Sequence, residues 1–361
     1  MSKIRVLVVD DSALMRKLIP QMLEADEAIE VVGTAMDGTF CLKKIDDLKP
    51  NVVTLDLEMP GMNGIDTLKE IMRRQPLPVI VVSSHSTDGA TVTMKALGLG
   101  AFDFVAKPKD ATGHMAETAA ELIAKIKAAA GCKIVRPGVA GGTNQRPAKL
   151  SMPRSEQAPN KIIAIGISTG GPQALEFLLT QFPADFPGSI LVVQHMPEGF
   201  TDMFARRLDE LCALQVKEAQ SGDVLQAGRV LICPGSRHMK VKRLPMGDVA
   251  VLNDDPRVNG HRPSVDVLFR SVAEEFGSDG IAVLMTGMGD DGAQGLGAVK
   301  QAGGTTVAQS EDSCVVFGMP KAAIERGYAM RVVNLDALAA SLLALCGRRG
   351  DFGTRAVQAG R

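Results

Sequence analysis

The sequence predicts an α/β protein with two doubly wound, mostly parallel-sheet domains joined by a linker. Three observations lead to this fold class. Short β-branched runs alternate with amphipathic helical patterns in both halves, which is typical of parallel sheets covered by helices on both faces. The length of 361 residues exceeds one ordinary core and, at roughly 150 residues per domain, suggests two. A stretch rich in Gly and Pro separates the two halves.

The first domain is expected over residues 1–128. Its strand-like runs are IRVLVVD, IEVVGTA, NVVTLDL, PVIVVSS and FDFVAKP. The helical segments between them are SALMRKLIPQML, GTFCLKKIDDL, GIDTLKEIMRR and GATVTMKALGLG. Five such βα units form a doubly wound open sheet of flavodoxin-like size.

A flexible linker is expected over residues 129–160, because no apolar periodicity continues there. The α/β alternation resumes in a second domain over residues 161–346. Its strand-like runs are KIIAIGI, SILVVQ, RVLICP, DVAVLN, GIAVLMTG and TTVAQ, and its helical segments include PQALEFLLTQF, VDVLFRSVAEEF and AQGLGAVKQAG. Residues 347–361 are expected to form a disordered tail.

The composition argues against several classes of protein. The formal net charge is −1, and one tyrosine with no tryptophan leaves little for stacking on nucleic acid. Acidic residues interrupt the N-terminal apolar run, so it is not a signal peptide, and no run approaches the roughly 18 apolar residues of a membrane span. The six cysteines form no C-x-x-C pair, which favours reduced thiols over zinc sites or disulfides. We therefore expect a cytoplasmic protein without membrane insertion or nucleic-acid binding.

Polar side chains end four of the predicted strands in the first domain. These residues are Asp10, Asp11, Asp56, Ser83 and Lys107. Because the ends of parallel strands meet at one edge, the three carboxylates would repel each other unless a cation such as Mg²⁺ neutralised them. A carboxylate there could accept a phosphoryl group, whose oxygens Lys107 and Ser83 would contact. Alternatively, Asp10 and Asp11 only cap the helix that follows.

The motifs VVDDS, TLDLEMPGMNG, VVSS and FVAKP resemble the receiver domain of two-component response regulators. The resemblance covers about residues 1–125 and implies that a sensor histidine kinase phosphorylates Asp56. It implies a Mg²⁺ site formed by Asp10, Asp11, Asp56 and the backbone carbonyl of Glu58. It also implies a cis peptide before Pro108, since X-Pro bonds tolerate the cis form. Phe104 stands where many receivers carry a switch tyrosine, which excludes a signal through a phenolic hydroxyl.

A serine lies between glycines at the end of the first strand of the second domain, in GISTGGP. Ser168 could be a nucleophile on a sharp turn, a hydroxyl in a phosphate loop, or part of a tight connection. The next strand ends in His195, and GIAVLMTG leads into a turn with Asp290 and Asp291. If these strands are parallel neighbours, serine, histidine and aspartate meet at one edge, as nucleophilic acyl transfer requires. The residues alone do not choose between the two aspartates.

Each of these residues also has a structural interpretation. Ser168 could cap the helix that follows it, His195 could be a hydrogen-bonded core histidine, and the aspartates could cap the next helix. Their joint placement at three strand ends favours catalysis. The order Ser–His–Asp differs from the order Ser–Asp–His of α/β-hydrolases, so either a different fold has converged on the same chemistry or these residues do not form a triad. A thiol mechanism through Cys314 is a further alternative, although its strand-like apolar setting favours a structural cysteine.

The motifs GISTGGP, QHMPEGFT, NGHRPSVDVLF, LMTGMGDDG and CVVFGMP together resemble the catalytic domain of the chemotaxis protein-glutamate methylesterase/glutamine deamidase family (CheB). The order of receiver, linker and catalytic domain matches this family too. The resemblance implies that Ser168 is the nucleophile, His195 the general base and Asp291 the orienting acid. It also implies an active-site lining formed by Thr169, His261 and Met288. The backbone N–H of Met288 would donate to the oxyanion.

The resemblance implies a phosphorylation-activated enzyme that demethylates glutamate methyl esters, and deamidates certain glutamines, on methyl-accepting chemoreceptors. The esterase chemistry would need no cofactor, and Mg²⁺ would bind only in the receiver. The alternatives are a second domain that reads DNA and one that binds a nucleotide. The chain has no short helix-turn-helix with clustered Lys and Arg, and GISTGGP does not complete a phosphate-binding fingerprint.

Overall fold

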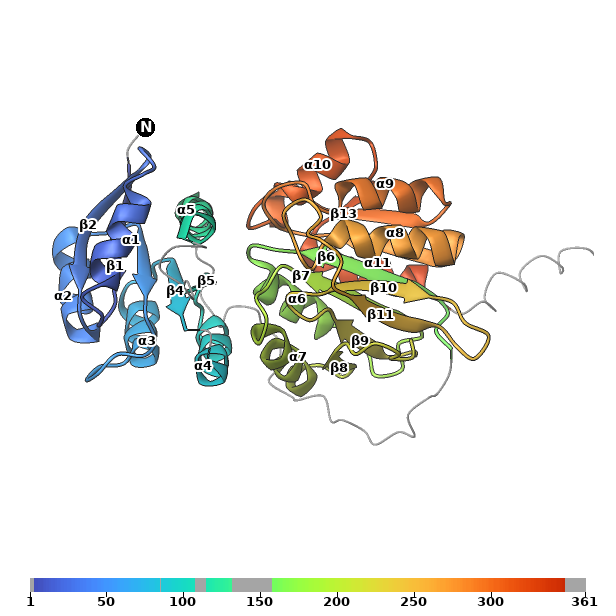
Figure 1. The fold of residues 1–361 in the computed structure, drawn as a ribbon, viewed down its shortest axis with the longest axis horizontal. Helices are drawn as coiled ribbons and strands as arrows, with labels where there is room; N and C mark the ends of the chain where they lie inside the picture. The colour runs from blue at the N-terminus through green and yellow to red at the C-terminus, as the bar shows by residue number, and fades with distance from the viewer. Residues whose placement is uncertain (1–2, 85, 108–114, 132–157, 348–361) are drawn as a thin grey trace, which may run out of the picture. The chain divides into compact units, whose positions relative to one another are not determined.

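The computed structural model describes residues 3–84, 86–107, 115–131 and 158–347. The chain divides into two compact units, and each is built around a parallel sheet (Figure 1). The two predicted α/β domains are therefore confirmed. In the part that the structure describes, no helix is long and apolar enough to cross a membrane. Most of the expected linker, the expected tail from residue 348 and the peptide bond before Pro108 lie outside the described residues.

The first unit has five parallel strands in the order β2-β1-β3-β4-β5. The strands are β1 (Ile4–Val9), β2 (Ile29–Ala35), β3 (Val52–Leu55), β4 (Val79–Ser83) and β5 (Asp103–Ala106). The helices are α1 (Met15–Leu23), α2 (Gly38–Leu48), α3 (Gly64–Arg74), α4 (Thr87–Gly98) and α5 (Met115–Gly131). The strand order reverses between β1 and β3, and ligands bind beyond the strand ends at such a switch point.

Helices α1 and α5 cover one face of this sheet. Their buried side chains share one apolar cluster with β1, β3, β4 and β5; the helical members include Ile19, Leu23, Leu122 and Ile126. Helices α2, α3 and α4 form a second row, in which α3 contacts both neighbours. Each of these three helices begins at a side chain that accepts from its first turn, namely Asp37, Asn63 and Ser86.

The second unit has seven parallel strands in the order β14-β13-β12-β6-β7-β9-β8. The strands are β6 (Ile162–Ile167), β7 (Ser189–Gln194), β8 (Gln215–Glu218), β9 (Arg229–Ile232), β12 (Gly280–Leu284), β13 (Thr305–Gln309) and β14 (Arg331–Val333). Strands β10 (His238–Lys242) and β11 (Val249–Asn253) form a separate antiparallel ribbon. The helices are α6 (Gly171–Leu179), α7 (Phe200–Leu211), α8 (Val265–Phe276), α9 (Ala293–Gln301), α10 (Met319–Glu325) and α11 (Leu335–Leu345), with 3₁₀ turns η1 (Gly277–Asp279) and η2 (Glu311–Ser313).

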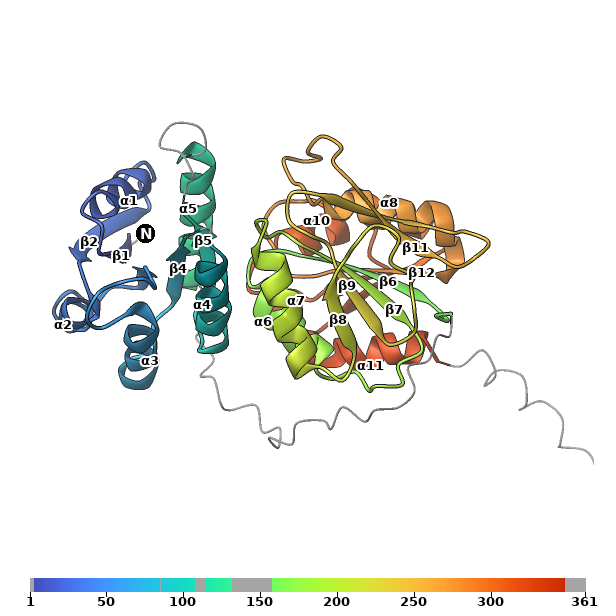
Figure 2. The same ribbon diagram turned by 60° about the horizontal axis from the view of Figure 1, so that its bottom comes forward.

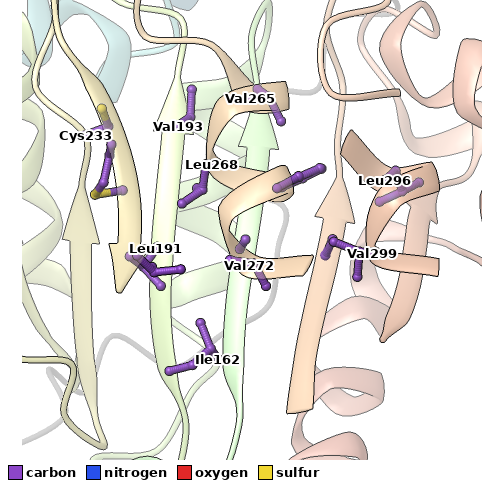
Figure 3. Close-up of a cluster of buried hydrophobic side chains, with 14 of the residues drawn as sticks. Ile162, Leu191, Val193, Cys233, Val265, Leu268, Val272, Leu296 and Val299 are labelled. Carbon is purple, nitrogen blue, oxygen red and sulfur yellow. The ribbon is translucent and has the colours of Figure 1, made fainter. Parts of the chain in front are cut away.

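The main core of the second unit lies between the sheet and the layer formed by α8, α9 and the β10–β11 ribbon. Figure 3 shows side chains of this core from β6, β7 and α8, including Ile162, Leu191, Leu268 and Val272. Helix α6 contacts α7 and α11, and these three helices lie across the sheet from α8 (Figure 2). Because both faces are covered, the ends of the strands are where the unit can present polar groups.

Three strands of the second unit were not predicted. Strands β8, β10 and β14 are short and carry charged side chains such as Lys217, Lys240 and Arg331, so they lack the continuous apolar pattern of central strands. The run DVAVLN is a strand as expected, but it pairs antiparallel with β10 instead of joining the main sheet.

Candidate active site and acidic pocket

Ser168, His195 and Asp291 come from neighbouring strand ends of the second unit. Ser168 follows β6 and His195 follows β7, while Asp291 lies in the turn after β12; β6 pairs with both other strands. Backbone bonds continue this pairing beyond the strands. The His195 N–H donates to the Ile167 carbonyl at 3.1 Å, and the Ser168 N–H donates to the Thr286 carbonyl at 2.9 Å. The serine therefore lies between the histidine-bearing turn and the aspartate-bearing turn.

Two glycines allow close backbone packing around Ser168. A Cβ on Gly287 would lie 2.7 Å from the Ser168 Cβ, and one on Gly171 would lie 2.1 Å from Gln194 Oε1. Gln194 Nε2 donates to the carbonyl of Ser168 at 3.0 Å. A side chain at either glycine would therefore push apart the turns that hold the serine.

His195 and Asp291 are directly hydrogen-bonded, with 2.9 Å between Nε2 and Oδ2. An ionised carboxylate can only accept, so Nε2 carries the proton and Nδ1 has a free lone pair. Nδ1 is buried and has no hydrogen-bond partner among the described residues. The imidazole is thus arranged to take a proton at Nδ1 while Asp291 stabilises the resulting cation.

The buried carboxylate of Asp291 accepts hydrogen bonds from several segments. Oδ2 also accepts from the Val265 N–H at 2.7 Å, and Oδ1 accepts from the Ser264 hydroxyl at 2.7 Å and the Asn259 amide at 3.1 Å. Burial alone raises the pKa of this carboxyl, but the bonds from His195, Ser264 and the Val265 N–H hold it well below its usual range. Val265 is the first residue of α8, so the carboxylate also caps a helix N-terminus, where a negative charge is favoured.

The lowered pKa of Asp291 predicts a pH-dependent contribution to stability. A carboxyl group with a lower pKa in the folded state stabilises the fold above its unfolded pKa of about 3.9, and this stabilisation is lost as the pH falls through the folded value. We therefore expect the free energy of unfolding to fall more between about pH 6 and about pH 3 in the parent than in Asp291→Asn. Urea denaturation at both pH values measures the two changes, and equal changes would contradict this role of the charge.

The structure separates the two aspartates that the sequence left open. Asp290 is exposed, and its carboxylate pairs with Arg326 at 2.6 Å. Asp291 is buried and bonds to His195. Of the two carboxylates, only that of Asp291 is therefore in place to orient the imidazole.

The expected lining residues Thr169, Met288 and His261 also lie at this edge. Thr169 follows the serine and is buried. The Met288 side chain is half exposed, and its backbone N–H donates to no other described residue, so it is available to an oxyanion. The His261 ring stacks on the ring of His195, with centroids 3.9 Å apart and planes inclined by 3°.

Cys314 lies in a loop after η2, not in the strand-like setting expected from the sequence. Burial raises the pKa of its thiol to about 12, with the charge of Glu311 acting in the same direction. The thiolate is the nucleophilic form of cysteine, and almost none is present at neutral pH with such a pKa. This environment supports a structural role for Cys314.

The sequence did not predict three polar residues that donate hydrogen bonds to Asp291, namely Ser264, Asn259 and Asp266 through its backbone N–H. Ser264 occupies the N-cap of α8, yet its hydroxyl accepts no bond from the helix N–H groups and instead donates to Asp291. Asn259 donates to Asp291 and to the buried Asp266, whose pKa is raised by burial. All three lie in the motif NGHRPSVDVLF, where a cluster of polar residues before an apolar helix was the available signal.

In the first unit, Asp10, Asp11 and Asp56 form an acidic pocket, with one oxygen from each within 4.8 Å of the others. Asp10 and Asp56 are buried and Asp11 is exposed. Lys107 Nζ lies 2.6 Å from Asp56 Oδ2 and 3.0 Å from Asp10 Oδ2. Burial raises the pKa of Asp10 and outweighs the opposing effect of Lys107. The structure thus brings the predicted carboxylates and lysine together.

Ser83 and Glu58 lie beside this pocket. The buried Ser83 hydroxyl accepts from Thr93 of α4 at 2.7 Å, and it lies 3.2 Å from the Gly89 carbonyl of α4 and 3.4 Å from the Ser84 carbonyl, to either of which it can donate. The Glu58 N–H donates to Asp56 Oδ1 at 3.1 Å. A phosphoryl group on the aspartate would compete with α4 for the serine hydroxyl.

Phe104 is buried in β5. Lys125 of α5 donates to its carbonyl at 2.5 Å, and the ammonium lies 5.3 Å from the ring centroid. The first contact joins the β5 backbone to α5, and the second joins the buried ring to the same lysine.

The donor set of the acidic pocket fits Mg²⁺, which prefers hard oxygen ligands. Asp10 Oδ2 is buried and accepts no hydrogen bond from the described residues, although its charge pairs with Lys107. Asp11 and Asp56 each add a carboxylate oxygen.

The fold and the two sites together define a class of protein. A parallel sheet with an acidic pocket is followed in one chain by an α/β unit that brings Ser, His and Asp to one edge, which is the organisation of a receiver domain with an enzyme domain. The family model "Response regulator receiver domain" matches residues 6–118, and the model "CheB methylesterase" matches residues 163–342. The chain belongs to the CheB methylesterase family.

Relatives and a solved structure agree with this assignment. A protein-glutamate methylesterase/protein-glutamine glutaminase of Koribacter versatilis is 64% identical over 342 residues, covering 93% of this chain and 94% of that protein. One from Halalkalibacterium halodurans is 46% identical over 349 residues, covering 96% and 99%. The crystal structure of the Thermotoga maritima CheB methylesterase catalytic domain is 43% identical with a TM-score of 0.51, and the match covers 52% of this chain and 100% of that one. The predicted family is confirmed.

Proposed function

We propose that this chain hydrolyses glutamate γ-methyl esters, and the amide of certain glutamines, on methyl-accepting chemoreceptors. The observation that carries the proposal is the bond between His195 Nε2 and the buried Asp291, which leaves Nδ1 without a hydrogen-bond partner among the described residues. Family membership supports the substrate class, since the curated relatives are named for these two activities. The reaction would reset receptor output during chemotaxis in the cytoplasm.

Hydrolysis would proceed in two steps. The Ser168 hydroxyl oxygen attacks the γ-carbonyl carbon while His195 Nδ1 takes its proton, and the Met288 N–H stabilises the oxyanion. The carbon–oxygen bond to the methoxy group breaks, and His195 returns the proton so that methanol leaves. Water then attacks the acyl-enzyme with His195 again as base, which releases glutamate and restores Ser168. For glutamine, ammonia leaves in place of methanol.

The experiment is a methanol-release assay on methyl-esterified receptor fragments, with and without a small-molecule phosphodonor. The proposal expects release that depends on the chain and rises with the phosphodonor. Absence of methanol release from receptors of the organism that supplies the sequence would contradict it. Binding of a nucleotide or of DNA without hydrolysis would instead support a purely binding second unit.

The receiver would control the esterase through phosphorylation of Asp56 by a sensor histidine kinase. An oxygen of the Asp56 carboxylate would form a bond to phosphorus as the phosphohistidine N–P bond breaks. Lys107, 2.6 Å from that carboxylate, is placed to pair with the new phosphoryl oxygens. Asp10, Asp11, Asp56 and the Glu58 carbonyl would hold Mg²⁺, which supplies charge neutralisation for the phosphoryl group.

We expect Asp56→Asn to lose stimulation by the phosphodonor and to keep the basal methylesterase rate. The amide retains the shape of the side chain but cannot accept the phosphoryl group. Initial rates with and without phosphodonor measure this, and Asp46→Asn, on the exposed side of α2, is the matched control. Undiminished stimulation of Asp56→Asn would contradict the assignment of the phosphorylated residue.

We expect deletion of residues 1–150 to raise the basal methylesterase rate. A flexible linker would allow the receiver to cover the catalytic edge, and phosphorylation would shift that equilibrium. The rate of the truncated chain is compared with that of the unphosphorylated full chain. A slower truncated enzyme would indicate that the receiver assists catalysis instead of blocking it.

A further inference from the structure

A two-residue turn contacts both His195 and Asp291. Val258 and His261 exchange backbone hydrogen bonds at 3.0 and 2.9 Å and enclose Asn259 and Gly260. The φ angles of these two central residues are 53° and 79°. Positive φ at both positions is typical of a type I′ turn, for which Asn-Gly is the preferred pair. The turn is therefore a locally fixed element in which the positions of Asn259 and His261 are linked.

Asn259 lies between two buried carboxylates. Its amide Nδ2 donates to Asp291 Oδ1 at 3.1 Å and to Asp266 Oδ2 at 2.9 Å. The two carboxylates are 1% and 0% exposed, so water contributes little to screening them. Asp266 is held in turn by the Gly295 N–H of α9 at 2.7 Å. One amide thus bridges the two carboxylates and links Asp291 to Asp266 of α8, which is itself bonded to α9.

His261 provides the second contact of the turn. Its ring lies parallel to the imidazole of His195 at 3.9 Å between centroids. A flat ring against one face limits tilting of the imidazole, while the bond to Asp291 fixes rotation within the ring plane. The direction of Nδ1 is therefore determined by two contacts from different sides.

We propose that this turn is a clamp that positions the catalytic pair: Asn259 orients the carboxylate of Asp291, and the His261 ring orients the imidazole of His195. The clamp rests on the proposed function, in which Asp291 and His195 act on Ser168. Asn259 and His261 exchange no proton or bond with the substrate, so both are positioning residues.

Variants that keep the turn can test each contact. Asn259→Gly retains a residue that tolerates positive φ and removes only the amide. We expect kcat to fall about ten- to hundred-fold with KM unchanged, the range for losing one hydrogen bond to a charged group. Asn259→Asp also tolerates this backbone but adds a third carboxylate, so kcat should fall further. His261→Phe should stay within about threefold of the parent because it keeps a stacked ring, whereas His261→Ala should lose about tenfold.

The rates are measured on the full chain with a peptide that carries a glutamate γ-methyl ester. They are expressed per serine titrated with a fluorophosphonate, which removes misfolded enzyme from the comparison. A parental kcat per titrated site in Asn259→Gly would overturn the clamp, as would His261→Phe falling as far as His261→Ala. Ser168→Ala has no active serine to titrate, so its rate is expressed per folded chain, and it tests the proposed function separately. Turnover by Ser168→Ala would contradict the assignment of the catalytic triad. If Ser168→Ala is inactive and Asn259→Gly is fully active, only the clamp is rejected.

Discussion

Ser168→Ala is expected to abolish methanol release from methyl-esterified receptor, with kcat falling by about a million-fold. Alanine removes the only atom that can form the acyl-enzyme, and no neighbouring group replaces it in the proposed reaction. The substitution is small and leaves the backbone bond between the Ser168 N–H and the Thr286 carbonyl in place. The fold should therefore persist, which circular dichroism and urea denaturation can verify.

Ser278→Ala is the matched control for this loss. Ser278 is exposed in η1, at the beginning of β12 and thus at the opposite end of the strand from the site. Its removal should leave kcat at the parental value. Methanol release by Ser168→Ala at more than a trace of the parental rate would show that another group performs the chemistry.

Asp291→Asn is expected to reduce kcat by about 10⁴-fold. The amide keeps the size of the carboxylate, but it removes the charge that stabilises the imidazolium and can present a donor to Nε2. The imidazole then favours the other tautomer, with the proton on Nδ1, where it cannot accept from the serine.

Asp290→Asn tests whether this loss belongs to one aspartate. Asp290 is adjacent in sequence, but its carboxylate pairs with Arg326 at the surface. Exposed ion pairs contribute about 1 kcal/mol or less to stability, so activity should remain close to that of the parent. Equal losses in the two variants would contradict the assignment of Asp291 as the orienting acid.

The sequence predicts the central strands of both sheets because they are continuous apolar runs. All six residues of β6 and all six of β7 are buried, as expected for a parallel sheet covered on both faces. Edge and ribbon strands could not be recognised in this way. In β10, for example, Lys242 is exposed and alternates with the buried Val241, a pattern that polar loops can also produce.

The same principle explains which site residues were predictable. Ser168, His195, Asp10 and Asp56 follow strands, so the strand-end rule places them without any knowledge of tertiary contacts. The strand-end rule could not choose between Asp290 and Asp291, since neighbouring residues in one turn direct their side chains differently; the choice of Asp291 came from the family resemblance. Asn259 was not predictable because its importance depends on a type I′ turn and on two carboxylates that are distant in sequence.

The most direct measurement of the central claim is covalent labelling of the active serine. The full chain is treated with a fluorophosphonate, digested, and analysed by mass spectrometry while residual methylesterase activity is followed. The proposed mechanism predicts one label per chain, located on Ser168, with activity lost in proportion to labelling. Full methylesterase activity in protein labelled completely at Ser168, or inactivation by a label at another residue, would contradict it.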